Sequence, residues 1–249
     1  MRILITNDDG IFADGMLTLA RALEQEHEVH IVAPDTQRSA QSHAITILEP
    51  MTIKKQAIRG IEGPAYSVTG TPADCVRVAI EAISTDAPYD LVVSGLNYGL
   101  NAGMDVLYSG TVSAAVEANL YGLPSIAASC EVIDGAAQFV PAAEAVNDFI
   151  RRNGGQLLEH KILLNMNFPY AMQNAAPLQI AEIGDPIFDT FTLQEDGDEM
   201  TLMAKGRKEI QFAENTDRYY LDRNLPTITP IQYNFTHRDW MERLKSWKA

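Results

Sequence analysis

The chain has 249 residues, of which 46% are hydrophobic and 21% are charged. This length and composition are ordinary for a globular protein with a substantial core, and they argue against global disorder. The formal net charge of -14 excludes a general affinity for nucleic-acid backbones, because the overall field repels polyanions. We therefore expect no nucleic-acid polymer among the partners of this protein.

The first residues, MRILITNDDG, form a short apolar run that is broken by polar residues. They lack the basic start and the apolar core of a secretory signal, and no apolar stretch approaches the roughly 20 residues of a membrane span. We expect a cytoplasmic protein that does not bind membranes. Cys75 and Cys130 lie in apolar contexts, which favours two buried side chains over a redox or metal pair.

The first elements alternate between strand and helix. Residues 2–6 are β-branched and aliphatic, which predicts a buried strand, and residues 15–23 carry apolar side chains at helical spacing. Residues 29–33 predict a second strand. A strand, a helix and a strand in this order form a βαβ unit, which implies a parallel sheet with a right-handed crossover.

The middle of the chain continues this alternation after an irregular stretch. Residues 38–52 predict a loop that enters a strand or hairpin around Ile45–Leu48. A short strand at 66–68 precedes a helix to residue 83, for which Thr71 is the expected N-cap and Pro72 the first helical residue. Residues 90–94 predict another buried strand, and a polar loop then leads to a helix at 111–119.

The last part of the chain changes in texture after Pro169. Before it, we predict a strand at 124–129, a helix at 136–151 and a strand at 163–167. After it, the alternation of strand and helix stops. The predicted domains are an α/β core at 1–169, an antiparallel arm at 170–235 whose last strand returns to the body, and a C-terminal helix at 236–249.

Polar residues gather in the loops that follow the predicted strands, where open parallel sheets bind their ligands. Asp8 and Asp9 end the first strand, and two adjacent carboxylates repel each other unless a cation or a proton neutralises one of them. Oxygen ligands suit Mg²⁺ or Mn²⁺, so the pair predicts a metal site. The alternative is that Asp8 caps a turn and Asp9 is solvated.

Three other loops fall at the same edge of the sheet. Ser39 lies in the second loop, and Asn97 closes a later strand, where its amide can bind a metal or a phosphate oxygen or can simply form an Asx turn. Ser109, Gly110 and Thr111 lead into a helix, whose free N–H groups can bind a phosphate. A plain N-cap at Ser109 or Thr111 remains open, and both roles can hold together.

The loops together resemble a known family. The segments MRILITNDDG, APDTQRSAQS, GTPADCV, VSGLNYGLNAGMDVLYSGTVSAAVEA, LNMNFP and ITPI resemble the SurE family of stationary-phase survival proteins, in order, over residues 1–169 and again around 217–236. The resemblance implies a Rossmann-like three-layer core with a mostly parallel sheet, and a 5'/3'-nucleotidase that is often active on short polyphosphate. The sequence departs from the family pattern at Ala40, where glycine is common, and over 217–230.

The resemblance also implies the site residues and the cofactor. Carried over by motif, the ligands of one Mg²⁺ or Mn²⁺ ion per subunit are Asp8, Asp9, Ser39 and Asn97. The phosphate of a nucleoside monophosphate meets Asn97 and residues Ser109 to Thr111. Asp8 and Asp9 are the catalytic residues through a metal-activated water, and the sequence identifies no separate general base. The family assembles as a homodimer or a homotetramer.

Rival functions fit the sequence less well. An aspartyl-phosphate phosphatase needs an Asp-x-Asp pattern, and Gly10 stands two residues after Asp8. A signalling receiver module needs an aspartate at the end of its third strand, where residues 90–94 end in serine. A non-catalytic nucleotide- or phosphate-binding module of the same fold remains the alternative to an enzyme.

Overall fold

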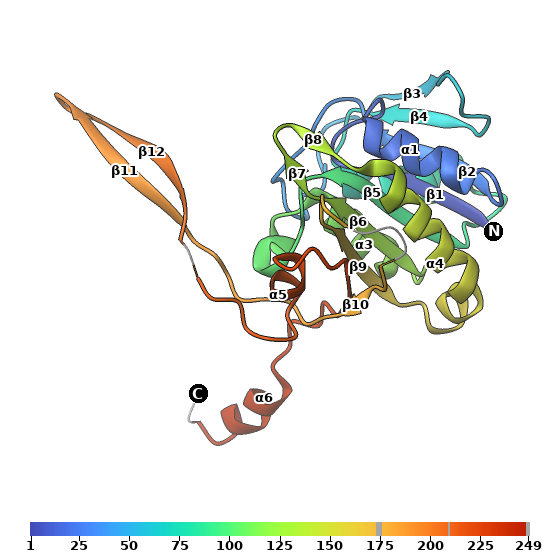
Figure 1. Cartoon of the computed structure of the whole chain (residues 1–249). Helices are drawn as coiled ribbons and strands as arrows, with labels where there is room; N and C mark the ends of the chain where they lie inside the picture. The colour runs from blue at the N-terminus through green and yellow to red at the C-terminus, as the bar shows by residue number, and fades with distance from the viewer. Residues whose placement is uncertain (173–175, 209, 248–249) are drawn as a thin grey trace.

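The computed structural model describes residues 1–172, 176–208 and 210–247 (Figure 1). The strands are β1 (Arg2–Thr6), β2 (Glu28–Pro34), β3 (Ile53–Gln56), β4 (Ala65–Val68), β5 (Leu91–Tyr98), β6 (Ser125–Cys130), β7 (Val132–Ile133), β8 (Ala136–Ala137), β9 (Leu163–Phe168), β10 (Gln179–Ile180), β11 (Asp189–Asp196), β12 (Glu199–Arg207) and β13 (Thr227–Ile231). The helices are α1 (Asp14–Leu23), α2 (Pro72–Val78) with a π-helical turn at Ala79–Ile83, a 3-10 turn at Gly103–Leu107, α3 (Gly110–Leu120), α4 (Phe139–His160), α5 (Asp217–Leu221) and α6 (Arg238–Leu244).

The main sheet has the order β10-β13-β9-β6-β5-β1-β2-β4-β3 within the described residues. The strands from β4 to β9 in this order are all parallel, and they follow the Rossmann order 3-2-1-4-5-6. On one side of this parallel set β3 pairs antiparallel with β4, and on the other side β13 pairs antiparallel with β9. The predicted Rossmann-like α/β class is confirmed, and the order of the strands reverses between β1 and β5, where this fold binds ligands.

Helices cover both faces of the sheet, which gives three layers (Figure 1). Ile3 and Ile5 of β1 face α1 and α4, whereas Leu4 faces α2 and α3. Because alternate residues of a strand point to opposite faces, a strand that is covered on both sides must be apolar throughout. This requirement explains the continuous apolar runs at 3–5 and 91–93.

Two predicted elements differ from the structure. The predicted strand around Ile45–Leu48 is wrong: the segment is a loop, because Thr46 donates its N–H and its hydroxyl to Asp74 rather than to a neighbouring strand. The predicted helix at 136–151 begins at Phe139 and runs to His160. Residues 132–137 instead form a small hairpin, whose turn at Asp134-Gly135 has positive φ at both positions.

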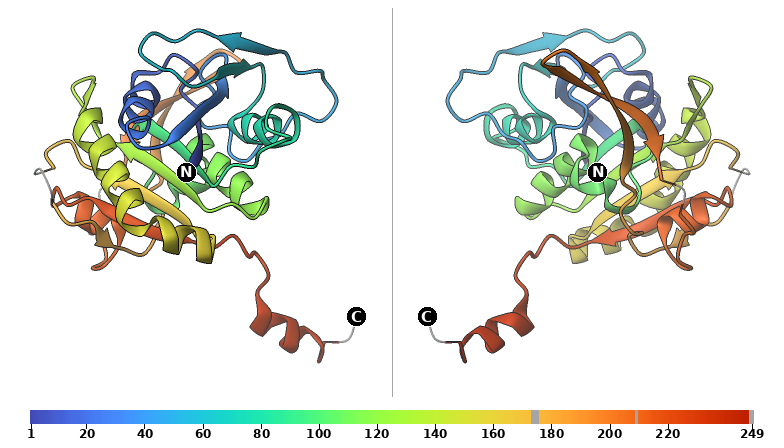
Figure 2. Two further views of the ribbon diagram at one scale, coloured as in Figure 1. Left: turned by 90° about the vertical axis from the view of Figure 1, so that its right-hand side faces the viewer. Right: turned by 90° about the vertical axis from the view of Figure 1, so that its left-hand side faces the viewer.

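The region after Pro169 is only partly separate from the core. β10 and β13 complete the main sheet, whereas β11 and β12 form an antiparallel hairpin that projects away from the body (Figures 1 and 2). α6 follows β13 and lies below the body in Figures 1 and 2, also away from the sheet. Within the described ranges, no helix has the length and apolar character needed to cross a bilayer.

Candidate active site

The first loop is held in shape by Asn7. Its amide nitrogen donates to the Gly10 carbonyl at 2.9 Å, and its amide oxygen accepts from the Gly10 N–H at 3.2 Å. Gly10 has a φ of +105°, a conformation that a side chain would strain. The residue that caps this turn is therefore Asn7 and not Asp8, which was the alternative role considered for Asp8. Both aspartate side chains can then contact neighbouring elements.

Asp8 points at the start of α3. Its Oδ1 accepts a hydrogen bond from the Thr111 hydroxyl at 2.5 Å, and its side chain is almost completely buried. Gly110 packs directly against it, since a Cβ on Gly110 would lie 2.8 Å from Asp8 Cβ and 3.0 Å from Asp8 Oδ2. Burial raises the pKa of Asp8 to about 6, and Asp9 adds to this, although Thr111 opposes it.

Asp9 points at the end of β5 and at the second loop. Its Oδ2 accepts from the Tyr98 N–H at 2.9 Å. The Gln37 amide nitrogen lies 3.5 Å from Asp9 Oδ1 and donates to Ser39 Oγ at 2.9 Å, so it stands between the two oxygens. Burial raises the pKa of Asp9 as well. The two carboxyls therefore share an environment that disfavours their ionised forms in the absence of a cation.

The second loop is fastened to the first loop, to the turn before α3 and to α3 itself. Arg38 N–H donates to the Asp8 carbonyl at 2.7 Å, and the Ser42 hydroxyl donates to the Leu107 carbonyl at 2.6 Å. His43 Nε2 lies 2.7 Å from Oε2 of Glu117, a buried carboxylate on α3. These contacts fix the segment that carries Ser39 and explain the position of His43.

The remaining predicted residues lie at the end of β5 and at the start of α3. The side-chain amide nitrogen of Asn97 donates to the Gly99 carbonyl at 2.7 Å, and its amide oxygen takes no part in that hydrogen bond. The next residue, Tyr98, donates its N–H to Asp9. Ser109 is the N-cap of α3 and accepts from the Val112 N–H at 3.1 Å. The start of α3 therefore has an N-cap at Ser109 and also a first-turn N–H at Gly110, of the kind that can bind an anion.

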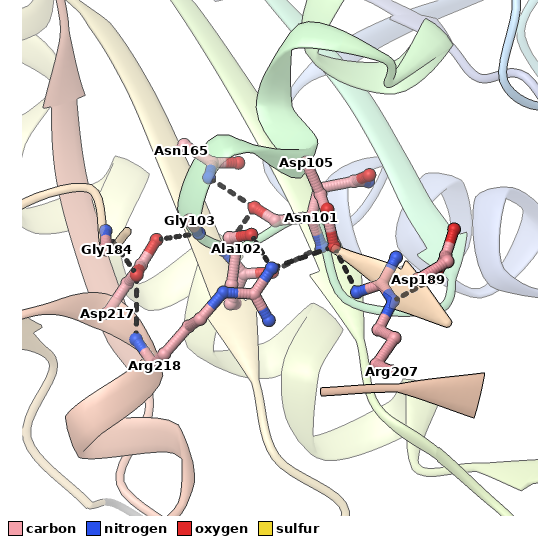
Figure 3. A network of polar contacts seen from close by, with 11 residues as sticks. Asn101, Ala102, Gly103, Asp105, Asn165, Gly184, Asp189, Arg207, Asp217 and Arg218 are labelled. Carbon is pink, nitrogen blue, oxygen red and sulfur yellow. Dashed lines mark hydrogen bonds and ion pairs between the residues drawn. The ribbon is translucent and has the colours of Figure 1, made fainter. Parts of the chain in front are cut away.

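A buried polar network holds the loop between β5 and α3 from behind (Figure 3). The carbonyl of Asn101 accepts hydrogen bonds from the side-chain amide nitrogens of Asn165 at 2.8 Å and Asn167 at 3.0 Å. The Asn101 N–H in turn donates to Asn167 Oδ1 at 2.9 Å. The Asn101 side chain donates to Ser129 at 2.8 Å. Asparagines on β9 thus position a loop that is more than sixty residues earlier in the chain.

The C-terminal region completes this network. Asp217 of α5 is fully buried and accepts from Gly103 N–H at 2.6 Å, Gly184 N–H at 2.9 Å and Arg218 N–H at 2.7 Å. Arg218 donates to Asp105 at 2.9 Å, and Arg207 at the base of the hairpin donates to the same carboxylate at 2.7 Å. Figure 3 shows that the loop, α5 and the hairpin base meet at Asp105.

Asp217→Ala is expected to lower the free energy of unfolding by about 3 kcal/mol, because buried N–H groups without an acceptor are costly. Chemical denaturation measures the change. The matched control is Asp222→Ala, whose exposed side chain pairs with its neighbour Arg223, and which should stay within about 0.5 kcal/mol of the parent protein. Equal stabilities of the two variants would contradict the anchoring role of Asp217.

Comparisons with known proteins identify the family of this chain. Residues 3–189 match the family model described as "Survival protein SurE". The chain belongs to the SurE family. It is 40% identical to "5'-nucleotidase SurE" of Clostridium tetani (strain Massachusetts / E88) over 249 residues, which cover 99% of this chain and 100% of the relative. It is 41% identical over 246 residues to the protein of the same name from Clostridium botulinum (strain 657 / Type Ba4), with 97% of each chain covered.

A solved structure of the family shows the same architecture. The SurE protein from Aquifex aeolicus superposes with a TM-score of 0.85 at 29% sequence identity, and the match covers 98% of both chains. Family membership and the Rossmann-like core are thereby established, and the resemblance drawn from the loop motifs is confirmed.

The chemistry of the donor set suits a hard divalent cation. Asp8, Asp9, Ser39 and Asn97 offer only oxygen atoms, and the Gln37 amide already places partial positive charge between Asp9 and Ser39. Across the described residues, no group of three or more His, Cys, Asp or Glu side chains is placed to hold a metal. Both cysteines are buried free thiols, and burial raises the pKa of Cys130 to about 12.

Sequence reasoning missed the residues that support this site. Gln37, Glu117 and Asp217 were not singled out, although each touches a predicted site residue or its loop. The sequence carried one usable signal for the small hairpin, since Asp134-Gly135 between two short apolar pairs is typical of a tight β-turn. The sequence carried no signal for Asp217, whose carboxylate binds the Gly103 N–H more than a hundred residues earlier in the chain.

Proposed function

We propose that this chain is a phosphomonoesterase that hydrolyses nucleoside 5'-monophosphates to nucleoside and phosphate. The observation that carries the proposal is the pair of carboxyls at the switch point of the sheet: Asp8 is buried against the N-terminus of α3, and Asp9 beside it is half-buried. The curated relatives are named 5'-nucleotidases, which supports the same activity here. Hydrolysis of 3'-monophosphates and of short polyphosphate is part of the proposal.

The proposed cofactor is one Mg²⁺ or Mn²⁺ ion, with Asp8, Asp9, Ser39 and Asn97 as its ligands. When bound, such an ion polarises phosphoryl oxygens and lowers the pKa of a coordinated water. The raised pKa values of both aspartates support this assignment, because a cation would relieve the burial of their charges.

The protein's own groups have separate roles in this proposal. Thr111 orients the Asp8 carboxyl through its hydroxyl, and Gly110 leaves room for that carboxyl. The N–H groups at the start of α3 bind phosphate oxygens and stabilise the charge that develops on them during in-line attack by water. Asn97 and Ser109 flank this position from the adjacent loops.

Release of inorganic phosphate tests the function. A panel of 5'- and 3'-nucleoside monophosphates is incubated with the protein in EDTA, in Mg²⁺ and in Mn²⁺. We expect release only with a metal, and more from the 5'-esters. Binding of nucleotides without any release would favour the alternative, a non-catalytic nucleotide-binding module. Full release in EDTA would contradict the metal assignment.

We also propose that residues 170–235 serve oligomerisation, as a homodimer or a homotetramer, and that the protein is cytoplasmic. Large apolar side chains are exposed on the β11–β12 hairpin, including Phe191, Leu193, Met200 and Leu202. Exposed apolar surface of this kind marks interaction sites. Two buried free thiols accord with a reducing compartment. Sedimentation of the full chain distinguishes a monomer from the proposed assemblies.

A further inference from the structure

A pocket adjoins Asp9 on the side away from α3. Its volume is about 450 Å³, within the range of small-molecule sites. It is lined by residues from four parts of the chain that meet at the ends of β1, β2, β5 and β8. These residues are Asp9, Ala13, Asp14, Gly15, Gln37, Tyr98, Gly135, Ala136, Ala137 and Phe139.

Tyr98 connects the proposed reaction centre with the far end of the pocket. Its N–H binds Asp9, while its hydroxyl reaches the turn of the small hairpin, where a Cβ on Gly135 would lie 3.9 Å from it. The side chain of Tyr98 is partly exposed, at 46%. It therefore forms a wall that runs from Asp9 to the β7–β8 hairpin.

Phe139 forms another part of the lining and is fixed in place. A Cβ on Gly15 would lie 2.8 Å from Phe139 Cε1, so the ring packs directly on the backbone at the start of α1. The ring is only partly buried and lines the pocket. A fixed aromatic side chain that remains accessible is a suitable surface for a flat heterocycle.

The charge of the lining restricts what can enter. Asp9 and Asp14 are its carboxylates, and its lining residues include no lysine, arginine or histidine. A second phosphate group would meet negative charge there without compensation. A neutral group with hydroxyl or amine donors is compatible, because the Asp14 carboxylate and the amide oxygen of Gln37 accept hydrogen bonds.

We infer that this pocket binds the nucleoside part of the substrate, with the base against Tyr98 and Phe139 and the sugar hydroxyls toward Asp14 and Gln37. The inference rests on the proposed function, since it places the phosphate at Asp8 and Asp9. It makes Phe139 and Tyr98 the residues that determine preference for nucleotides over other phosphate esters. It also predicts that the pocket accepts a neutral leaving group and not a polyphosphate chain, because the carboxylates of Asp9 and Asp14 line it.

Paired kinetics test the inference. For the parent protein, Phe139→Ala and Tyr98→Ala, kcat/KM is measured with adenosine 5'-monophosphate and with glycerol 3-phosphate, which has no base. We expect the ratio of the two values to fall about tenfold or more in each variant, mainly through KM for the nucleotide. The matched control is Val140→Ala, an exposed neighbour outside the pocket, which should leave the ratio unchanged.

Two further arms keep the outcomes separate. Ala136→Trp fills the pocket from an exposed position and should lower the same ratio even if Phe139→Ala fails to fold. Binding of free adenosine, followed by NMR, does not depend on turnover and should weaken about tenfold in the Tyr98 and Phe139 variants. Unchanged ratios with unchanged adenosine binding would overturn the pocket assignment. Absence of phosphate release from both esters would instead overturn the proposed function, and adenosine binding would then decide the pocket.

Discussion

Asp8→Asn is expected to abolish phosphate release and, in the metal-free protein, to increase stability above pH 6. The activity is lost because an amide cannot supply the negative charge that a divalent cation needs at this position. We expect a loss of about a thousandfold or more in kcat, as when other charge-stabilising groups are removed from active sites. The shape of the side chain is kept, so the fold should be unaffected.

The effect on stability follows from the direction of the pKa shift. Burial raises the pKa of Asp8 from 3.8 to about 6 in the folded chain. The folded state therefore binds more protons than the unfolded state between these values, and stability falls as the pH rises through this window. Above pH 6 the ionised carboxyl costs roughly 3 kcal/mol, which the asparagine variant avoids.

Thermal unfolding in EDTA at pH 5 and pH 7.5, together with a phosphate-release assay, measures both effects. The difference in stability between variant and parent should be larger at pH 7.5 than at pH 5. Asp86→Asn, at an exposed position, should change neither property. A variant that releases phosphate at a near-normal rate would remove Asp8 from the proposed metal site.

Gly110→Ala is expected to lower kcat by about a hundredfold or more. The added methyl group would lie within 3.0 Å of the Asp8 carboxyl and 3.1 Å from Pro72 Cγ, so one of these groups must move. Displacement of a reacting group by about 1 Å is enough for a loss of this size. Stability should also fall, by about 1–3 kcal/mol, because the contact is in a packed interior.

Gly155→Ala is the matched control for this substitution. Gly155 lies in α4, and a Cβ there would meet no atom within 4 Å. This variant should keep full activity and gain up to about 1 kcal/mol of stability from the better helix propensity of alanine. Equal activity of the two alanine variants would show that the close approach of Gly110 to Asp8 is not needed for turnover.

The sequence was most informative where a single local rule decides the structure. The alternation of apolar strands and amphipathic helices predicted the parallel core, because burial on both faces demands apolar strands such as residues 2–6. The same rule brought Asp8, Asp9, Ser39 and Asn97 to one edge of the sheet. Thr71 also behaves as predicted: it caps α2 in a reciprocal pair of hydrogen bonds with Asp74.

Elements decided by tertiary contacts were less predictable. α4 continues through Gly154 and Gly155 because its buried face, which includes Ile150 and Leu157, packs on the core on both sides of them. The loop at 45–48 follows Asp74 rather than its own alternating pattern. The pocket beside Asp9 was not visible at all, since Gln37, Tyr98 and Phe139 carry no shared spacing in the chain.

The dependence of the loop on Asp217 has a consequence for biosynthesis. All four proposed metal ligands and the start of α3 have left the ribosome long before residue 217 is translated. The N–H of Gly103 obtains its carboxylate acceptor only when α5 docks, and α5 is more than a hundred residues later in the chain. A nascent chain that ends at residue 169 would thus hold every proposed ligand and the contacts of Asn165 and Asn167 with the loop, but not the carboxylate that binds the Gly103 N–H. The loop is therefore completed by a segment that is synthesised after the core that carries the proposed chemistry.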